Sequence, residues 1–288
     1  MTKYQIYTVD AFASQPFTGN QAGIVTMPSW QPIAEETMQK LAAEMNISET
    51  AYLTPVDHLG EQEFQQASRF SLRWFTPTVE VRLCGHATLA AAHVLVHELG
   101  NHNEELRFDT LGGVLVVRKS PHGHLDMTFP LDIPEPVSIN ENFKLLATSV
   151  FGYYSDQMQM ELSPALRYLV IYDPQKSAQE IACLQPRVNE ALEAGHRERV
   201  EIVIATGKGQ QEDFVSRVFG PWCGIDEDPV TGSAHTVLAP FWNKRLQKSQ
   251  FVAKQCSKRG GILNLQLDND HVRISGSAVV VLRGSIEL

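Results

Sequence analysis

The chain has 288 residues, of which 43% are hydrophobic and 20% are charged, proportions typical of a folded globular protein rather than a disordered one. Lysine and arginine together number 24 and aspartate and glutamate 33, which gives a formal net charge of −9. This acidic excess argues against a nucleic-acid or anionic-membrane partner, because such a surface would release no counterions on binding. Small anionic substrates are not excluded, since they respond to local donors. The length is enough for two domains or one large one.

The segment that begins the sequence has no apolar core of signal-peptide length, and no run of about eighteen apolar residues predicts a membrane-spanning helix. The four cysteines are far apart and form no CxxC pair: Cys84, Cys183, Cys223 and Cys256. Such spacing predicts neither a zinc site nor a secreted disulfide framework. We therefore expect a cytoplasmic protein with reduced thiols and no bound metal.

Alternating and helical patterns of apolar residues predict an alternation of strands and helices along the whole chain. In the first half we expect strands at 6–11, 24–27, 49–53, 70–74, 106–110, 114–118 and 125–129, and helices at 33–45 and 89–95. In the second half we expect strands at 168–172, 200–206, 214–219, 251–254, 262–267, 272–275 and 278–283, and helices at 143–150, 178–192 and 232–246. Pro130, Pro134 and Pro136 mark the clearest linker between the halves.

One short pattern occurs twice, half a chain apart. Arg73-Trp74-Phe75-Thr76-Pro77 resembles Arg217-Val218-Phe219-Gly220-Pro221 at an offset of 144 residues, which is half of 288. The same offset aligns Cys84 with Asp228, and in each copy a strand and a long loop lead to a glycine-containing turn and a helix of small residues. The repetition predicts two similar lobes that face each other across a cleft.

Polar or reactive side chains stand where each of these two helices is expected to begin. The first backbone N–H groups of a helix have no intrahelical partner, and the helix dipole adds about half a positive charge there. Two such ends can together hold a substrate carboxylate without an arginine. The alternative is that Thr88, Thr231 and Ser233 only cap their helices, as these residue types often do.

Glu49 lies between a predicted helix end and an apolar strand, where partial burial would raise the pKa of its carboxyl toward neutrality. A carboxyl of that kind can both donate and accept a proton, although most glutamates are solvated surface residues. Cys84 and His86 flank Gly85, and at a helix start we expect a lowered pKa for the thiol and a neutral histidine. A Cys–His nucleophile would also need a third, orienting group, and the sequence reveals none.

Four groups of residues, in this order along the chain, resemble the PhzF-like (phenazine biosynthesis-like) family. They are Val9–Phe12 with Pro16–Asn20, Ser48-Glu49-Thr50, Phe75–Pro77 with Cys84-Gly85-His86, and Glu227–Ser233. The resemblance covers nearly the whole chain from Tyr4 onward, and it implies a diaminopimelate epimerase-like fold of α/β (α+β) class. That fold has two pseudo-symmetric lobes, each a mostly antiparallel sheet wrapped around a central helix, and such proteins are usually homodimers. On this basis we expect an N-terminal lobe of 1–122 plus 277–288 and a C-terminal lobe of 123–276.

The resemblance also implies a site and a reaction. In the family prototype a glutamate moves a proton within a ring, assisted by a histidine, an aspartate and a serine. Carried over by motif, the catalytic residues are Glu49, His86, Asp228 and Ser233, and the substrate-binding residues are Asn20, Gly85, Thr231 and Gly232. The resemblance thus predicts an isomerase that acts on a small carboxylic acid, and it implies no metal, nucleotide or pyridoxal cofactor.

Two other functions stay open. Related epimerases and racemases use one thiol from each lobe, and Cys84 matches the first thiol position, but the second-lobe loop 228–232 contains no cysteine. The other open function is that of a non-catalytic member of the fold, which binds a ligand or a protein without converting it. Retention of all four polar residues of the motif weighs against this last reading.

Overall fold

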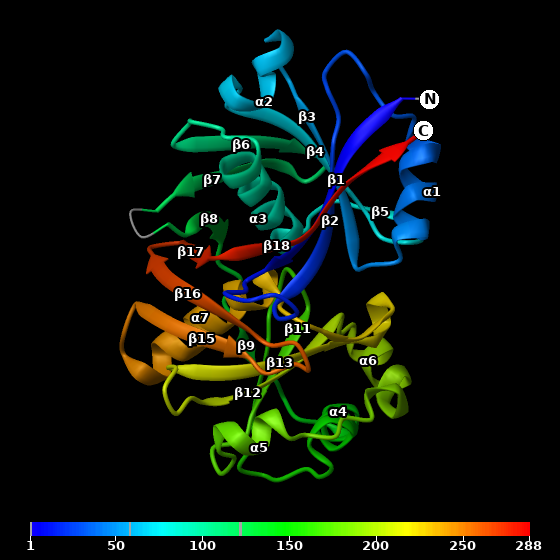
Figure 1. Cartoon of the computed structure of the whole chain (residues 1–288). Helices are drawn as coiled ribbons and strands as arrows, with labels where there is room; N and C mark the ends of the chain where they lie inside the picture. Colours follow the sequence, from blue (N-terminus) through cyan, green and yellow to red (C-terminus); the bar gives the residue numbers. More distant parts are fainter. Residues whose placement is uncertain (1, 58, 121–122) are drawn as a thin grey trace. The chain divides into compact units, whose positions relative to one another are not determined.

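The duplication that the sequence indicates is present in the computed structural model, which describes residues 2–57, 59–120 and 123–288 (Figure 1). The chain divides into two units. Unit 1 is Met1–Thr128 together with Ser275–Leu288, and unit 2 is Phe129–Ile274. Unit 1 is therefore discontinuous in sequence, because the chain returns to it after completing unit 2.

Unit 1 is built on a sheet in which antiparallel pairs predominate. Its strands are β1 (Lys3–Ala11), β2 (Asn20–Thr26), β3 (Glu49–Pro55), β4 (Arg69–Phe75), β5 (Glu80–Val81), β6 (Glu105–Thr110), β7 (Gly113–Lys119), β8 (Leu125–Pro130) and β18 (Ala278–Glu287). They pair in the order β18-β1-β2-β3-β4-β6-β7-β8, with β5 also on β4, and only the pairs β2/β3 and β4/β6 among these described ladders are parallel.

The helices of unit 1 are α1 (Glu35–Met45), η1 (Gly60–Gln62), α2 (Glu63–Gln66), α3 (Gly85–His93) and the π-helical turn η2 (Val94–Glu98). In α3 every residue from His86 to Ala92 is buried, and the helix packs against β1, β2, β3 and β18. Its small, apolar sequence lets the sheet approach it closely on all sides, as expected for a buried helix. The sheet of unit 1 thus wraps around α3 (Figure 1).

Unit 2 repeats this plan. Its strands are β9 (Glu135–Pro136), β10 (Gln159–Leu162), β11 (Tyr168–Tyr172), β12 (Ile202–Lys208), β13 (Phe214–Gly220), β14 (Ile225–Asp228), β15 (Gln250–Gln255), β16 (Gly261–Asp268) and β17 (His271–Gly276). They pair in the order β9-β10-β11-β12-β13-β15-β16, with β14 on β13. Among these described ladders the parallel pairs are β11/β12 and β13/β15, which correspond to β2/β3 and β4/β6 of unit 1.

The helices of unit 2 are α4 (Glu141–Phe151), α5 (Ala178–Ala182), η3 (Val188–Ala191), α6 (Leu192–Glu198), η4 (Pro221–Cys223) and α7 (Gly232–Leu246). The prediction of one helix over 178–192 is wrong, since α5 ends at Ala182 and η3 begins only at Val188. Pro186 lies in the gap, where its ring fixes φ and keeps the preceding residue out of the helical region.

The predicted helix 232–246 is confirmed as α7, the central helix of unit 2, although Pro240 lies inside it. A proline in a helix leaves the carbonyl four residues earlier without its hydrogen bond. Here that carbonyl belongs to Thr236, and it accepts from the backbone N–H of Asp132 at 3.3 Å. The helix continues because unit 2 supplies the missing donor and buries α7 from Ala234 to Trp242.

The two units are pseudo-symmetric, and the predicted fold class is confirmed. The repeated arginines make matching contacts, because Arg73 forms a bidentate ion pair with Glu80 and Arg217 forms one with Glu227. The alignment of Cys84 with Asp228 is wrong, however. The central helices begin at Gly85 and Gly232, an offset of 232 − 85 = 147, so the structural equivalent of Cys84 is Thr231.

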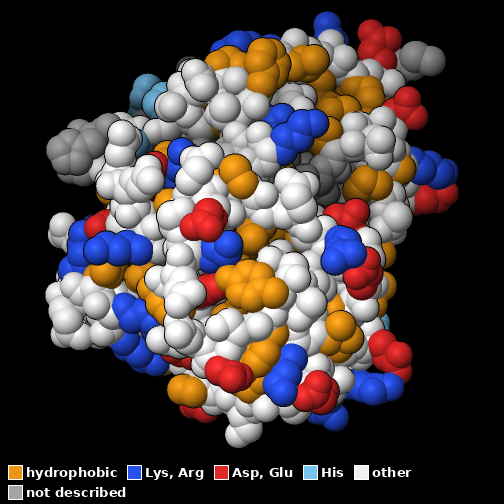
Figure 2. Space-filling view, turned by 90° about the horizontal axis from the view of Figure 1, so that it is seen from below, with side chains coloured by type: hydrophobic (Ala, Val, Ile, Leu, Met, Phe, Trp, Pro, Cys, Tyr) orange, Lys and Arg blue, Asp and Glu red, His pale blue; other side chains and the backbone are white. Residues whose placement is uncertain are grey.

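Among the described residues, every helix falls short of the length and apolar character that crossing a membrane requires. Figure 2 shows acidic and basic side chains interspersed over the face seen from below, with hydrophobic side chains between them. Both signs of charge are therefore mixed on this face.

Candidate active site

Three predicted site residues come together in unit 1. Helix α1 ends at Met45, and Asn46 adopts the left-handed conformation (φ 50°) that commonly ends a helix and redirects the chain toward β3. Glu49 is the first residue of β3, and His86 is the second residue of α3. The His86 Nε2 atom lies 3.0 Å from Glu49 Oε2, and the two side chains are only 9% and 12% exposed.

The Cys84 thiol completes this group. Its Sγ atom lies 3.5 Å from Nδ1 of His86 and 3.9 Å from Nε2, so the imidazole contacts both a thiol and a carboxylate. The sequence reasoning found no third group that could orient a Cys–His pair, and that conclusion is wrong because Glu49 occupies this position. The family motifs place Glu49 and His86 in one site, but the contact of all three side chains comes from the packing of α3 on β3, which the spacing of these residues does not reveal.

The protonation states differ from those expected at a helix start. Burial is the largest influence on His86 and lowers its pKa, but the neighbouring Cys84 and Glu49 together outweigh it and raise the pKa well above the usual value. Burial, aided by the Glu49 charge, raises the pKa of the Cys84 thiol instead of lowering it. The Glu49 charge therefore favours the protonated form of His86, and burial favours the neutral form of the Cys84 thiol.

The same three residues are also a set of ligands that a metal ion could use. One ligand atom of each of Glu49, Cys84 and His86 lies within 4.8 Å of those of the other two. Thiolate, imidazole and carboxylate are the three ligand types of protein zinc sites. An ion there would displace the proton of His86 and interrupt the His86–Glu49 pair.

The other predicted residues of unit 1 lie near this group. Asn20 begins β2 and is fully buried, and two residues later Ala22 pairs with Glu49 of the parallel strand β3. Gly85 is the first residue of α3. The hydroxyl of Thr88 donates to the Cys84 carbonyl at 2.6 Å, so Thr88 does not cap the helix as the alternative reading held.

In unit 2, Asp228 and Thr231 form a second group at the start of α7. Thr231 is the N-cap residue of α7, but its hydroxyl donates to Asp228 Oδ2 and, among the described residues, accepts from no N–H of the helix. The buried Gln255, at the end of β15, accepts from the Thr231 N–H at 2.9 Å and donates to the Asp228 carbonyl at 2.7 Å. The capping interpretation is wrong for Thr231, which instead holds the carboxylate.

Ser233 is the second residue of α7 and contacts a residue that the sequence analysis did not single out. Its Oγ atom is 3.1 Å from the hydroxyl of Tyr168, the first residue of β11. Burial raises the pKa of Tyr168, while its hydrogen bond with Ser233 acts in the opposite direction. The pair presents two neutral hydroxyls that can donate to an anionic ligand.

His235 holds the backbone at Thr231, where α7 begins. It is fully buried, and its Nδ1 atom donates to the Thr231 carbonyl at 2.8 Å, since the carbonyl can only accept. Burial lowers its pKa to about 4, so the ring is neutral near pH 7. The structure thus brings together Glu49, Cys84 and His86 in unit 1, and in unit 2 it gathers Asp228 with Thr231 and Ser233 with Tyr168.

Comparisons with known proteins give similar chains over the full length. A profile of the family described as phenazine biosynthesis-like protein (PhzC-PhzF) matches residues 9–284. Phenazine biosynthesis-like domain-containing protein 1 of Mus musculus is 40% identical over 299 residues, with 99% of each chain covered. A Pseudomonas aeruginosa protein described as an uncharacterized isomerase is 40% identical over 283 residues, with 98% of each chain covered.

Solved structures are similar as well. The crystal structure of a phenazine biosynthesis protein of the PhzF family from Enterococcus faecalis superposes with a TM-score of 0.85 at 35% identity, and all of both chains is covered. A hydroxyproline epimerase from Agrobacterium vitis has a TM-score of 0.56 at 9% identity, with 99% of this chain and 92% of that chain covered. The second similarity concerns the fold alone.

Proposed function

The chain belongs to the phenazine biosynthesis-like protein family, and on this premise we propose that it is a cofactor-independent isomerase that moves a carbon-bound proton on a small carboxylic acid. Relatives described as isomerases support the class of reaction. The observation that carries the proposal is the buried contact of 3.0 Å between Glu49 and His86.

In this mechanism Glu49 is the base. The raised pKa of His86 favours the imidazolium, whose Nε2 atom lies 3.0 Å from the carboxylate that accepts the proton. When Glu49 removes a proton from carbon, the substrate becomes an enolate-like anion and Glu49 becomes neutral. The imidazolium then stabilises the negative charge on the substrate, and Glu49 returns the proton to a different carbon of the same molecule.

Asp228 and Ser233 are assigned the assisting roles that the family resemblance implies. Thr231 and Gln255 fix Asp228, which supports a role in relaying or orienting a proton. The Ser233 and Tyr168 hydroxyls are donors for a substrate oxygen. The first residues of α3 and α7, Gly85 and Gly232, are proposed to present backbone N–H groups to the substrate carboxylate.

The test is exchange of carbon-bound protons with D₂O, followed by NMR across a panel of small cyclic and unsaturated carboxylic acids. Glu49→Gln keeps the shape of the side chain and removes the base, so exchange of any acid turned over by the native protein should be abolished while binding of that acid is retained. Glu44→Gln, which removes an exposed carboxylate from α1, is the matched control. Exchange at the native rate in Glu49→Gln would exclude Glu49 as the base.

A second candidate is a racemase or epimerase in which Cys84 is one of two bases. The contact of 3.5 Å between Cys84 Sγ and His86 Nδ1 favours it, because the imidazole could take the thiol proton. Against it, the residue equivalent to Cys84 in unit 2 is Thr231. Cys84→Ala should abolish exchange under this mechanism and leave exchange largely intact under the carboxylate mechanism. A chain that binds acids but exchanges no proton in the whole panel is the non-catalytic alternative.

The family resemblance further implies a homodimer. Sedimentation at several protein concentrations tests this, with a mass of twice 32.1 kDa expected.

A further inference from the structure

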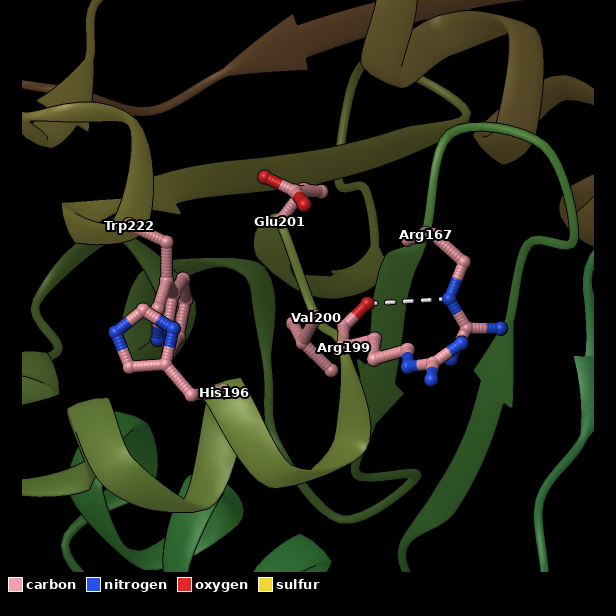
Figure 3. A pocket seen from close by; sticks show the side chains of 6 residues that line it. All are labelled: Arg167, His196, Arg199, Val200, Glu201 and Trp222. Atoms are coloured by element: carbon pink, nitrogen blue, oxygen red, sulfur yellow. Dashed lines mark hydrogen bonds between the residues drawn. The ribbon is translucent and has the colours of Figure 1, made fainter.

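A pocket of about 630 Å³ opens on the surface of unit 2, and its lining includes none of the residues of the proposed reaction (Figure 3). It is lined by Arg167, His196, Arg199, Val200, Glu201 and Trp222. They come from the segment before β11, from the end of α6 and the segment that follows it, and from η4. The volume lies within the range of about 300–1,000 Å³ typical of sites for small organic ligands.

The charges in this pocket favour an anion. Two guanidinium groups, those of Arg167 and Arg199, face one carboxylate, that of Glu201. Within the described part of the chain, neither arginine has a carboxylate oxygen within 4.0 Å. Most other arginines of unit 2 do have such a partner, as Arg197 has in Glu193 and Arg217 in Glu227. The positive charge of the pocket is thus not balanced by the protein.

Arg167 is held in position by the backbone. Its Nε donates to the Arg199 carbonyl at 3.1 Å and its Nη2 to the Glu198 carbonyl at 2.7 Å, as the dashed line in Figure 3 marks for the first of these. A guanidinium has five N–H donors in a planar fork, so three remain for a ligand after these two bonds. A fixed fork of this kind suits the paired oxygens of a carboxylate or a phosphate.

Trp222 gives the pocket a rigid aromatic wall. Its indole N–H donates to the Leu192 carbonyl at 3.0 Å, and its ring lies against Gly195 of α6 so closely that a Cβ there would be 2.2 Å from Cζ2. The glycine is therefore required by the position of the ring. A fixed indole in a pocket that also holds two guanidinium groups favours a ligand that has a flat ring as well as negative charge.

We propose that this pocket binds a small aromatic anion, with a carboxylate or a phosphate as the charged group. Arg199 and Arg167 hold the anionic group, and Trp222 packs against the ring. None of its six residues belongs to either catalytic group.

The test is isothermal titration of the intact protein with benzoate, phenyl phosphate, inorganic phosphate and the neutral benzamide. We expect saturable binding of one molecule of benzoate or phenyl phosphate per chain, and weaker binding of inorganic phosphate and benzamide. Whichever of benzoate and phenyl phosphate binds more tightly identifies the preferred charged group. The variants described next separate this site from the proposed reaction, because they change residues that line the pocket and belong to neither catalytic group.

Variants then locate the site. Arg199→Gln should weaken binding about tenfold, as expected for the loss of a charge-assisted hydrogen bond. Arg197→Gln is the matched control, since Arg197 is exposed on α6 two residues before Arg199, pairs with Glu193 and does not line the pocket. Trp222→Leu should weaken phenyl phosphate more than inorganic phosphate. Arg167→Gln should also weaken binding. If Arg167→Gln does not fold, the result for Arg199→Gln alone tests the role of the arginines.

Three results would overturn the proposal. The first is no saturable binding of either aromatic anion, and the second is equal binding of benzamide, which would remove the role of charge. The third is an equal loss of affinity in Arg197→Gln and Arg199→Gln, which would indicate nonspecific attraction to the basic surface.

Discussion

His86 Nε2 and Glu49 Oε2 are 3.0 Å apart, and both side chains are largely buried. A histidine so placed carries its proton to higher pH than a free one, because the surrounding thiol and carboxylate more than offset its burial.

The first prediction is that His86 is an imidazolium at pH 7.5. The ¹⁵N chemical shifts of its ring, measured by NMR, should show two protonated nitrogens in the native protein. In Glu49→Gln the loss of the carboxylate should let the ring titrate at lower pH. A neutral His86 in the native protein at pH 7.5 would contradict the ion pair.

The same shift predicts how His86 affects stability. Since its pKa is higher in the folded than in the unfolded state, the folded state binds more protons between the two values. Its stabilising contribution is therefore complete below about pH 6.5 and decreases as pH rises through the folded-state pKa. Urea denaturation of the native protein and His86→Gln at pH 6 and pH 9 should show a smaller difference between them at pH 9.

The third prediction concerns the reactivity of Cys84. Only the thiolate is alkylated, and burial together with the Glu49 charge raises the pKa of this thiol. Iodoacetamide at pH 7.5, followed by peptide mass spectrometry, should therefore modify the exposed Cys183 many times faster than Cys84. Unfolding in urea should remove the difference. Equal rates in the folded protein would show that Cys84 is reached by solvent as a thiolate.

The fourth prediction follows from the low pKa of His235. The unfolded chain binds a proton at this residue near pH 6.5 and the folded chain only near pH 4, so stability falls as pH is lowered through this window. Protonation of this residue in the unfolded chain should lower the free energy of unfolding by about 3 kcal/mol by pH 4. His235→Asn keeps a donor for the Thr231 carbonyl but cannot titrate. Its stability should depend less on pH between 4 and 6.5, and an unchanged slope would contradict the prediction.

The fifth prediction concerns Gln255, which connects Asp228 and Thr231. Gln255→Leu leaves the Thr231 N–H and the Asp228 carbonyl without these bonds, and should lower the free energy of unfolding by about 3 kcal/mol. Gln250→Leu, at an exposed position of the same strand, is the control and should change it by less than about 0.5 kcal/mol. Equal effects of the two changes would show that the bonds of Gln255 are unimportant.

Much of the fold could be predicted because strands and helices leave periodic patterns in the sequence. The predicted helices 33–45 and 232–246 and nearly all predicted strands are present, and the repeated Arg-x-Phe segments do occupy equivalent strands. Two errors have local causes. Pro186 divides the predicted helix 178–192, and Ile225–Asp228 forms a short strand on β13 although its three acidic residues are untypical of strands.

The site was harder to predict than the fold. The motifs predict Glu49, His86, Asp228 and Ser233 as site residues, but they give no indication of the side chains that contact Asp228 and Ser233, because Tyr168 and Gln255 come from distant strands. The protonation states were predicted in the wrong direction for Cys84 and His86. Burial and neighbouring charge determine these states, and neither can be read from the turn in which the two residues lie.

Strand β18 pairs with β1 from Lys3↔Glu287 to Ala11↔Ala278 and also contacts α3, so unit 1 is completed by a strand that follows the whole of unit 2 in the sequence. Unit 2 is continuous and takes its strands from one stretch of the chain. Deletion of β18 would therefore leave β1 without one of its two partner strands and uncover part of α3, while every strand of unit 2 would remain.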